Sequence, residues 1–243
     1  LVDIESKTVT CSPGFRPKAL KIPYDQLVFA LGNVTNYKGM RGLSEHAFGF
    51  KTLGDALAVR NHIIHILEEA VTETDDLYRK KMLTFVVSGG GFSGVEAIAE
   101  IYSFVKEASR LYPSISVGDC RFILIQRREL ILPEMPKSLS KYAQEALFHK
   151  GIEFMFNKSL VAATAECAIL DDDLEIPTKT IIATVPSSPN SIIEALDLPK
   201  SRGKLQVDGY CQVLSNNNLW ALGDCCLLPI KSNKQEPILY APP

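Results

Sequence analysis

The sequence has no excess of positive charge, no long hydrophobic run and no signal peptide. Its 26 Lys and Arg residues are balanced by 28 Asp and Glu residues, for a net charge of −2. Such a chain lacks the basic surface that phosphate backbones require, so we expect no nucleic-acid partner. No apolar run has the length of a membrane-spanning helix, and nothing at the start of the chain resembles a secretion signal.

Cysteine and histidine are also not arranged as reactive or metal-binding groups. The six cysteines include no C-x-x-C pair, and Cys225 and Cys226 are direct neighbours, which disfavours a disulfide bond between them. His62 and His65 share a predicted helix without a cysteine or carboxylate at ligand spacing. We therefore expect no metal site and mostly small, buried thiols in a reducing compartment.

The chain does have the composition of a globular protein and a clear alternation of elements. Hydrophobic residues make up 46% of its 243 residues, enough to bury a core. A helix begins near Thr52, where Asp55 completes a capping box. Periodicity then predicts strands at 84–88, 121–126 and 153–156 with helices at 93–109 and 138–150. This β-α-β-α-β order predicts a parallel sheet with helices on both faces. Further strands are expected at 27–31, 160–163, 168–170, 174–176, 180–184, 204–207, 210–214 and 219–222.

A glycine-rich turn stands between the first strand and helix of this region. It contains the pattern G-x-G-x-x-G as Gly89, Gly91 and Gly94, directly after a buried strand and at the start of an amphipathic helix. In that context the glycines permit a tight turn, close approach of a diphosphate and close packing of the helix on the sheet. Free N–H groups and the helix dipole would then hold the phosphates. The alternative is a glycine turn that serves packing alone.

The end of the second strand leaves the choice of coenzyme open. An acidic residue usually stands there and binds the adenosine ribose, but this chain has Gln126 followed by Arg127 and Arg128. An amide does not repel a 2′-phosphate and an arginine can pair with one, so NADPH is not excluded. A solvated pair of loop arginines is the alternative.

Three further segments resemble motifs of FAD- and NAD-linked reductases. Residues 24–32, with Ala30 and Gly32 at their end, are similar to the "YDxLVxAxG" strand. Residues 218–224 resemble the second FAD motif, in which Gly223 precedes Asp224 and the aspartate binds the ribityl chain of the flavin. Residues 181–185 resemble the strand that closes the NAD(P)H domain, with Val185-Pro186 in place of the usual glycine.

Within this superfamily the chain resembles type II NADH dehydrogenase. Residues 89–96 are similar to that family's G-G-G-x-[ST]-G-V-E, and residues 51–61 to its "KTLxDA…RN" helix. Residues 240–243 resemble the start of its "PTAQ" segment. The resemblance implies an α/β protein with a three-layer, Rossmann-like NAD(P)H-binding domain inserted in a partial FAD-binding domain. It implies FAD-binding parts at 1–50 and 196–243, a connecting helix at 51–76 and the NAD(P)H-binding domain at 77–195.

The family reaction would pass a hydride from NAD(P)H to FAD and then reduce a quinone of the respiratory chain. The residues placed near these cofactors are Gly89, Gly90, Gly91, Phe92, Ser93, Gly94, Glu96, Gln126, Arg127, Val185, Ala30, Gly32, Gly223 and Asp224. Glu96 is the candidate catalytic residue, beside the nicotinamide; an ordinary surface glutamate is the alternative. The implied location is peripheral to an energy-conserving membrane, on its cytoplasmic or organelle-matrix side, with a homodimer left open.

Two other functions remain open. One is a soluble ferredoxin reductase or disulfide reductase of the same superfamily; the second is disfavoured by the missing redox cysteine pair. The other is a nucleotide-sensing module without catalysis, favoured by the departure at Val185-Pro186. The first FAD glycine motif and the membrane-binding segments are not in this chain. We therefore expect a piece of a longer protein, with little or no turnover by itself.

Overall fold

The chain folds as two compact units. The structure is a computed structural model that describes residues 1–12, 14, 18–35, 37, 40–184 and 187–229. The first unit combines residues 1–34 and 187–243, and the second comprises residues 35–186. These divisions differ from the boundaries that the resemblance implies, because the helix at 51–76 belongs to the core of the second unit. The assignment of the units to FAD and NAD(P)H remains a prediction.

The second unit is built on a four-stranded parallel sheet. Its strand order is β12-β6-β7-β8, and its strands are β6 (Thr84–Ser88), β7 (Arg121–Gln126), β8 (Ile152–Phe156) and β12 (Thr180–Ala183). In the register, Val86 lies between Ile123 and Ile181. All residues of β6 are buried, and so is β7 after Arg121. Such continuous burial is typical of parallel strands covered on both faces.

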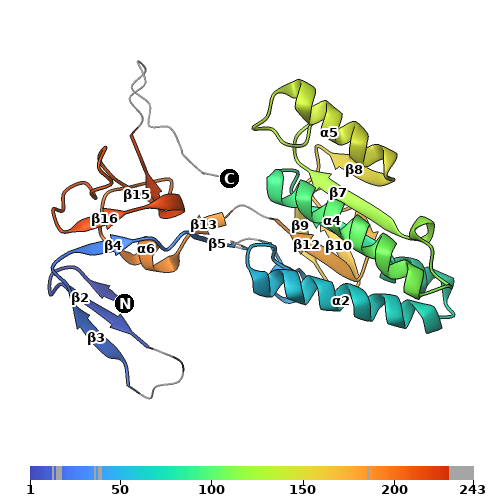
Figure 1. Ribbon diagram of the computed structural model, residues 1–243, viewed down its shortest axis with the longest axis horizontal. Helices are drawn as coiled ribbons and strands as arrows, with labels where there is room; N and C mark the ends of the chain where they lie inside the picture. Colours follow the sequence, from blue (N-terminus) through green and yellow to red (C-terminus); the bar gives the residue numbers. More distant parts are fainter. Residues whose placement is uncertain (13, 15–17, 36, 38–39, 185–186, 230–243) are drawn as a thin grey trace. The chain divides into compact units, whose positions relative to one another are not determined.

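Helices cover one face of this sheet (Figure 1). They are α2 (Leu53–Thr72), α3 (Asp76–Met82), α4 (Phe92–Ala108) and α5 (Lys137–His149), with the short turns η1 (Ser109–Leu111) and η2 (Val117–Asp119) after α4. The capping box of α2 is confirmed, since the Asp55 N–H donates to Thr52 Oγ1 over 3.1 Å and the Thr52 N–H to Asp55 Oδ2 over 2.7 Å. The acidic stretch after α2 also starts α3, because Asp75 Oδ1 accepts the N–H of Leu77 over 2.8 Å.

Strands, rather than helices, fill most of the opposite face. β9 (Leu160–Ala163), β10 (Cys167–Leu170) and β11 (Glu175–Pro177) form an antiparallel sheet that packs there with the single turn α1 (Leu43–His46). The expectation of helices on both faces is therefore wrong for the described residues. β6, β7 and β8 are added in one direction across the sheet. α4 and α5 pack on the same face of the sheet, as expected when parallel strands added in one direction are joined by right-handed crossovers.

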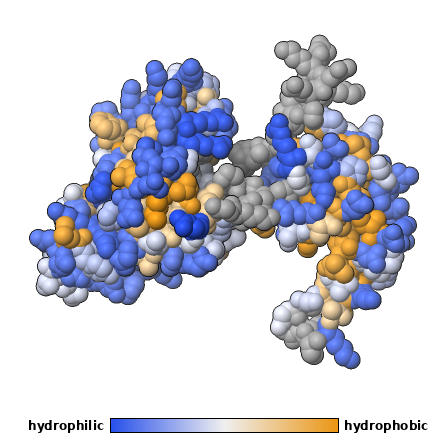
Figure 2. Space-filling view, turned by 180° about the vertical axis from the view of Figure 1, so that it is seen from behind, coloured by the Kyte–Doolittle hydropathy of each residue, from blue (hydrophilic) through white to orange (hydrophobic). Residues whose placement is uncertain are grey.

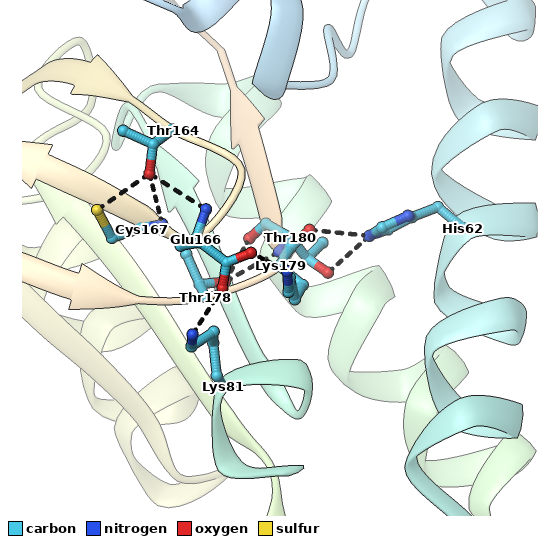
Figure 3. A network of polar contacts seen from close by, with 8 residues as sticks. All are labelled: His62, Lys81, Thr164, Glu166, Cys167, Thr178, Lys179 and Thr180. Carbon is cyan, nitrogen blue, oxygen red and sulfur yellow. Dashed lines mark hydrogen bonds and ion pairs between the residues drawn. The ribbon is translucent and has the colours of Figure 1, made fainter. Parts of the chain in front are cut away.

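A polar network ties three elements to the start of β12 (Figure 3). His62 of α2 places Nε2 3.1 Å from the Lys179 carbonyl oxygen and 2.9 Å from Thr180 Oγ1. Glu166, in the turn before β10, pairs with Lys179 and, over 2.6 Å, with Lys81 of α3. These contacts lie at the amino end of β12, so they hold the layers of the unit together at the edge opposite the glycine turn.

The first unit consists of short strands around a smaller core. An antiparallel sheet joins β1 (Val2–Asp3), β2 (Thr8–Cys11) and β3 (Leu20–Pro23), and β4 (Leu27–Phe29) pairs in parallel with β16 (Leu219–Ala221). The remaining elements are β5 (Asn33–Thr35) with β13 (Ser187–Pro189), β14 (Lys200–Ser201) with β15 (Lys204–Gln206) and β17 (Cys226–Leu227), α6 (Ser191–Ala195) and η3 (Gly223–Cys225). Phe29, Leu205 and Leu219 lie in its core.

The strand expected at 210–214 is wrong. Asp208 Oδ1 accepts the N–H groups of Tyr210 and Gln212, each over 2.9 Å, and this side-chain turn curls the segment. Only isolated bridges form there, at Gln212 and Val213. Within the described ranges, no helix combines the length and hydropathy of a membrane span.

Candidate functional site

β6 ends in a turn whose backbone requires glycine at position 89. Gly89 has φ of +112°, and a Cβ added there would lie 2.4 Å from Thr184 Oγ1. Thr184 follows β12 and closes the turn, since its N–H and its hydroxyl both donate to the Ser88 carbonyl oxygen, over 2.9 and 2.8 Å. These two hydrogen bonds fix the turn to the neighbouring strand.

Gly94 brings α4 close to this turn, and Gly91 leaves room beside it. A Cβ at Gly94 would lie 1.8 Å from the Gly89 carbonyl oxygen, whereas a Cβ at Gly91 would meet nothing within 4 Å. Gly91 is the N-cap of α4, and no described side chain caps this end. The first N–H groups of the helix therefore remain available to a ligand, and the helix dipole favours an anion there.

A cavity of about 310 Å³ opens at the carboxyl ends of the strands. Its lining includes the three glycines 89–91, Gln126, Lys158 and Thr184. Ligands of open α/β sheets bind at this edge, and the volume is at the lower end of the range for small-molecule sites. Of the residues that the sequence places near NAD(P)H, the structure brings five together around this cavity: Gly89, Gly90, Gly91, Gln126 and Arg127.

The loop after β7 is attached to the same turn. Gln126 is buried, and its Nε2 donates to the Leu130 carbonyl oxygen over 3.1 Å. The Leu132 N–H donates to the Gly90 carbonyl oxygen over 2.7 Å. Arg127 is exposed and lines the cavity. Gln126 therefore supports the loop through one N–H of its amide, and the side chain also lines the cavity.

The candidates on α4 itself are exposed. Phe92 and Ser93 are in the first turn of the helix, and Glu96 lies one turn further along. Because Glu96 is outside the first turn, the helix dipole is not a sufficient reason for a carboxylate there. None of these three side chains lines the 310 Å³ cavity.

The carboxyl ends of β4 and β16 form a second edge with glycines, in the first unit. Gly32 and Gly223 have φ of +57° and +72°, and a Cβ at either would meet nothing within 4 Å. The exposed Ala30 directly follows β4. Asp224 Oδ1 is shielded from solvent, yet no described group donates a hydrogen bond to it. A buried acceptor without a partner is costly, and a hydroxyl group of a bound molecule would satisfy it.

Comparison with known proteins agrees with two nucleotide-binding edges, one at the turn after β6 and one at the carboxyl ends of β4 and β16. The family model described as pyridine nucleotide-disulphide oxidoreductase matches residues 1–240. The chain belongs to this family. The resemblance to type II NADH dehydrogenase is confirmed by relatives of that kind, and the three-layer, Rossmann-like fold class is confirmed by solved structures.

Three relatives illustrate the similarity. A probable NADH dehydrogenase of Dictyostelium discoideum is 28% identical over 86% of this chain and 47% of its own length. A type II NADH:quinone oxidoreductase of Mycobacterium tuberculosis is 29% identical over 94% of this chain and 50% of its own. The structure of NDH2 from Plasmodium falciparum in complex with NADH has a TM-score of 0.86 and 25% identity, covering 93% of this chain and 49% of that one. The chain spans about half the length of the curated relatives it matches.

The disulphide chemistry in the family's name finds no support in the thiols of this chain. Cys225 is fully buried, and its thiol donates to the carbonyl oxygens of Phe29 and Leu222, over 3.4 and 3.2 Å. Burial raises the pKa of Cys226 to about 11, so its reactive thiolate is scarce at neutral pH. All six cysteines are free, and three of them are buried, whereas Cys11 is exposed. Among the described residues no cluster of potential metal ligands forms.

Some sequence expectations fall outside the described residues, and some lining residues were missed. Val185, Pro186 and residues 240–243 lie outside the part of the chain that the structure describes. Thr184 and Lys158 border the cavity but were not among the predicted site residues. Thr184 had a usable signal, because it is the last residue of the strand predicted at 180–184, which should end at the same edge as Gly89. Lys158 had none, because its position depends on how the chain turns after β8.

Proposed function

We propose that the protein is an FAD-dependent oxidoreductase that transfers a hydride from NAD(P)H to flavin and then reduces a quinone. The observation that carries this proposal is the glycine turn between β6 and α4, which opens on a 310 Å³ cavity. The relative from Mycobacterium tuberculosis is named an NADH:quinone oxidoreductase. Bound flavin would supply the redox chemistry, and the protein would bind and orient the reactants.

The second unit has the groups needed to hold NAD(P)H. The uncapped N-terminus of α4 and the space beside Gly91 suit a diphosphate. Gly90 and Gln126 line the neighbouring part of the cavity, where the adenosine would lie. Thr184 orders the turn through the Ser88 carbonyl oxygen.

The first unit fits FAD only in part. The unpaired Asp224 Oδ1 suits a ribityl hydroxyl, and Gly32 and Gly223 leave space for a ligand beside it. However, parallel strands are normally covered on both faces, and Val28 of β4 is 53% exposed while Leu222, just after β16, is 46% exposed. Figure 2 shows hydrophobic residues in orange on the surface of this unit. We infer that the FAD site requires sequence beyond these 243 residues.

Glu96 is proposed to contact the nicotinamide end of the coenzyme, where it would help bind the coenzyme or relay protons. Support for this comes from its exposed position on the helix that starts at the diphosphate site. For the longer protein we propose a quinone as the electron acceptor and a possible homodimer. We also propose that it associates peripherally with an energy-conserving membrane, on the cytoplasmic or matrix side. Relatives from Yarrowia lipolytica and Arabidopsis thaliana are named mitochondrial NADH- or NAD(P)H-ubiquinone oxidoreductases.

Anaerobic reduction tests the proposal. The full-length protein, purified with its flavin, is mixed with NADH or NADPH, and the flavin absorbance is followed. We expect bleaching by at least one coenzyme and recovery of the colour when a soluble quinone is added. Flavin that stays oxidised with both coenzymes would overturn the proposal. For the 243-residue chain alone we expect coenzyme binding with little flavin, so stoichiometric flavin in its visible spectrum would contradict our account of the first unit.

A further inference from the structure

The glycine turn is held from two sides through its carbonyl oxygens. On the side of β12, Thr184 donates two hydrogen bonds to the Ser88 carbonyl oxygen. On the side of β7, the Leu132 N–H donates to the Gly90 carbonyl oxygen over 2.7 Å. The turn is therefore attached to the elements that follow both neighbouring strands, and Leu132 forms the attachment in the loop after β7.

The hydrogen bond from Leu132 sets the direction of the next N–H group of the turn. The peptide group between Gly90 and Gly91 is trans, so its C=O and its N–H point in opposite directions. With the Gly90 carbonyl oxygen bound to Leu132, the Gly91 N–H points away from the loop. A Cβ at Gly91 would meet nothing within 4 Å, and both glycines line the 310 Å³ cavity. Leu132 thus orients a donor at the place where the diphosphate is proposed to lie.

Leu132 makes this contact in an unfavourable backbone conformation. Its φ is +48°, in the left-handed region that a bulky side chain seldom adopts. Leucine has no polar group that would favour this region, unlike asparagine or aspartate, and the following Pro133 favours an extended backbone here. Such strain persists only where surrounding contacts impose it, and it occurs often at ligand sites.

Contacts from α5 and from the loop itself hold Leu132 in this conformation. Ser140 of α5 is only 1% exposed, and its hydroxyl lies 3.1 Å from the Leu132 carbonyl oxygen and 3.4 Å from that of Pro136. The Met135 N–H also donates to the Leu132 carbonyl oxygen, over 2.9 Å. The half-buried side chain of Leu132 packs against the core of the second unit. The residue is therefore fixed at its N–H by the turn and at its C=O by α5.

We propose that Leu132 is a positioning residue for the coenzyme, whose strained backbone orients the Gly90–Gly91 peptide group toward the diphosphate while Ser140 holds that backbone in place. The inference rests on the proposed function, because it concerns the same diphosphate site. Leu132 does not line the cavity, so it acts through the glycine turn. The diphosphate is bound equally before and during hydride transfer, so the KM for the coenzyme should respond and kcat should not.

Two substitutions at Leu132 separate its backbone from its side chain. Both Leu132→Ala and Leu132→Gly remove the packed side chain, but only glycine adopts a positive φ without strain. Alanine keeps the strain and loses the packing that opposes it, so the loop should relax and release Gly90. We expect Leu132→Ala to weaken binding of NADH or NADPH to the full-length protein, followed by coenzyme fluorescence, about 10-fold. Its KM should rise with unchanged kcat. Leu132→Gly should stay within about 3-fold of the wild type.

Ser140 provides an independent test of the same support. Ser140→Ala removes one buried hydrogen bond, so coenzyme affinity should fall about 3-fold to 10-fold. In the Leu132→Gly background the same substitution should have little further effect, because glycine needs no support. Leu147→Ala is the matched control. It also removes a leucine side chain from this core, and Leu147 has no described hydrogen bond to the glycine turn. We expect a lower melting temperature and an unchanged KM.

The outcomes separate this inference from the proposed function. Equal loss of coenzyme affinity in Leu132→Ala and Leu132→Gly would assign the effect to packing and overturn the inference, and so would wild-type affinity in Leu132→Ala. Should Leu132→Ala not fold, wild-type affinity in Ser140→Ala overturns it instead. In each case, flavin bleaching of the wild type by NADH or NADPH would leave the oxidoreductase function standing. If neither coenzyme bleaches the wild-type flavin, the proposed function itself fails.

Discussion

The two units of the chain carry the same local device, parallel strands that end in glycine, in different surroundings. In the second unit the sheet has four strands, and two separate clusters of buried residues cover its two faces. In the first unit β4 and β16 form a parallel sheet of two strands, and Val28 of β4 remains exposed. Since a ligand site needs rigid supporting elements, we infer that the second unit holds a complete coenzyme site and the first unit only part of a flavin site.

The two functional proposals therefore depend on the 243-residue chain to different degrees. Binding of NAD(P)H should follow from contacts within residues 35–186. Retention of FAD should depend on Asp224 and on sequence outside the 243 residues. Variants that weaken the binding of one ligand and leave the other unchanged would support this distinction between the units, and variants that weaken both would contradict it.

The largest effect is expected from Gly94→Ala. The added Cβ would lie 1.8 Å from the Gly89 carbonyl oxygen and 2.9 Å from Thr184 Oγ1, so α4 must move away from the turn. Overpacking against a fixed backbone costs roughly 3 kcal/mol or more. We expect NAD(P)H binding, measured by quenching or enhancement of coenzyme fluorescence, to be lost, and the melting temperature of the second unit to fall.

Gly54→Ala is the matched control for this variant. A Cβ at Gly54, near the start of α2, would meet only Thr52 Oγ1, at 3.5 Å, which is an ordinary contact. We expect unchanged coenzyme binding and a slightly higher melting temperature, because alanine favours the helix more than glycine by about 1 kcal/mol. Normal coenzyme binding by Gly94→Ala would show that the close approach of α4 is not required.

The next effect concerns the first unit and Asp224→Ala. If Asp224 Oδ1 accepts a ribityl hydroxyl, its removal costs about 1.5–3 kcal/mol, or roughly 10-fold to 150-fold in flavin affinity. The full-length variant should lose flavin on dialysis, as read from its visible spectrum. Coenzyme binding to the second unit should not change. Full retention of flavin would mean that the orphaned oxygen of Asp224 has another role.

The strands of the second unit could be predicted from the sequence more accurately than those of the first. In the second unit the strands at 84–88 and 121–126 were predicted with the bounds of β6 and β7, because long buried strands give continuous apolar runs. The glycine turn was recognisable because Gly89 follows such a strand directly. In the first unit the short strand at 210–214 was mispredicted, since a single side-chain turn at Asp208 overrides its β-propensity.

Other features depend on contacts between distant residues, which a pattern does not reveal. The role of Gln126 as a support of the loop follows from its bond to Leu130 and its packing on Gly90. From the sequence it was expected to face the ribose. The antiparallel cover of β9–β11 was predicted as strands but not as a layer, because strand order across a sheet is not written in local periodicity.

A smaller effect is expected from Gly91→Ala. Its φ of −77° suits alanine and the new Cβ would meet nothing within 4 Å, so the fold should be retained. The methyl group would occupy the space through which a diphosphate approaches the backbone. We expect unchanged thermal stability and roughly 10-fold weaker NAD(P)H binding, which corresponds to about 1.4 kcal/mol. An unaltered affinity would place the diphosphate elsewhere.

The smallest effect is a pH dependence confined to the second unit, and it arises from His62. Burial lowers the pKa of this imidazole from its ordinary value of 6.5, opposed by its contact with the Lys179 carbonyl oxygen; His65 and Glu69 are the charged neighbours. Below pH 6.5 the unfolded chain therefore binds a proton at this imidazole that the folded unit does not bind. The free energy of unfolding must then decrease as the pH falls, until the pH is below the lowered pKa.

Urea unfolding between pH 8 and about pH 5 measures this effect. As the pH falls, the urea concentration at the unfolding midpoint of the second unit should decrease less steeply in His62→Gln than in the wild type. The glutamine amide can still donate a hydrogen bond to the Lys179 carbonyl oxygen. His65→Gln is the control, since His65 is exposed and pairs with Glu69 over 3.1 Å. If the midpoint changes equally with pH in the wild type and in His62→Gln, His62 is not the source of the pH dependence. A pH effect that appears only in the unfolding transition of the first unit would contradict the prediction as well.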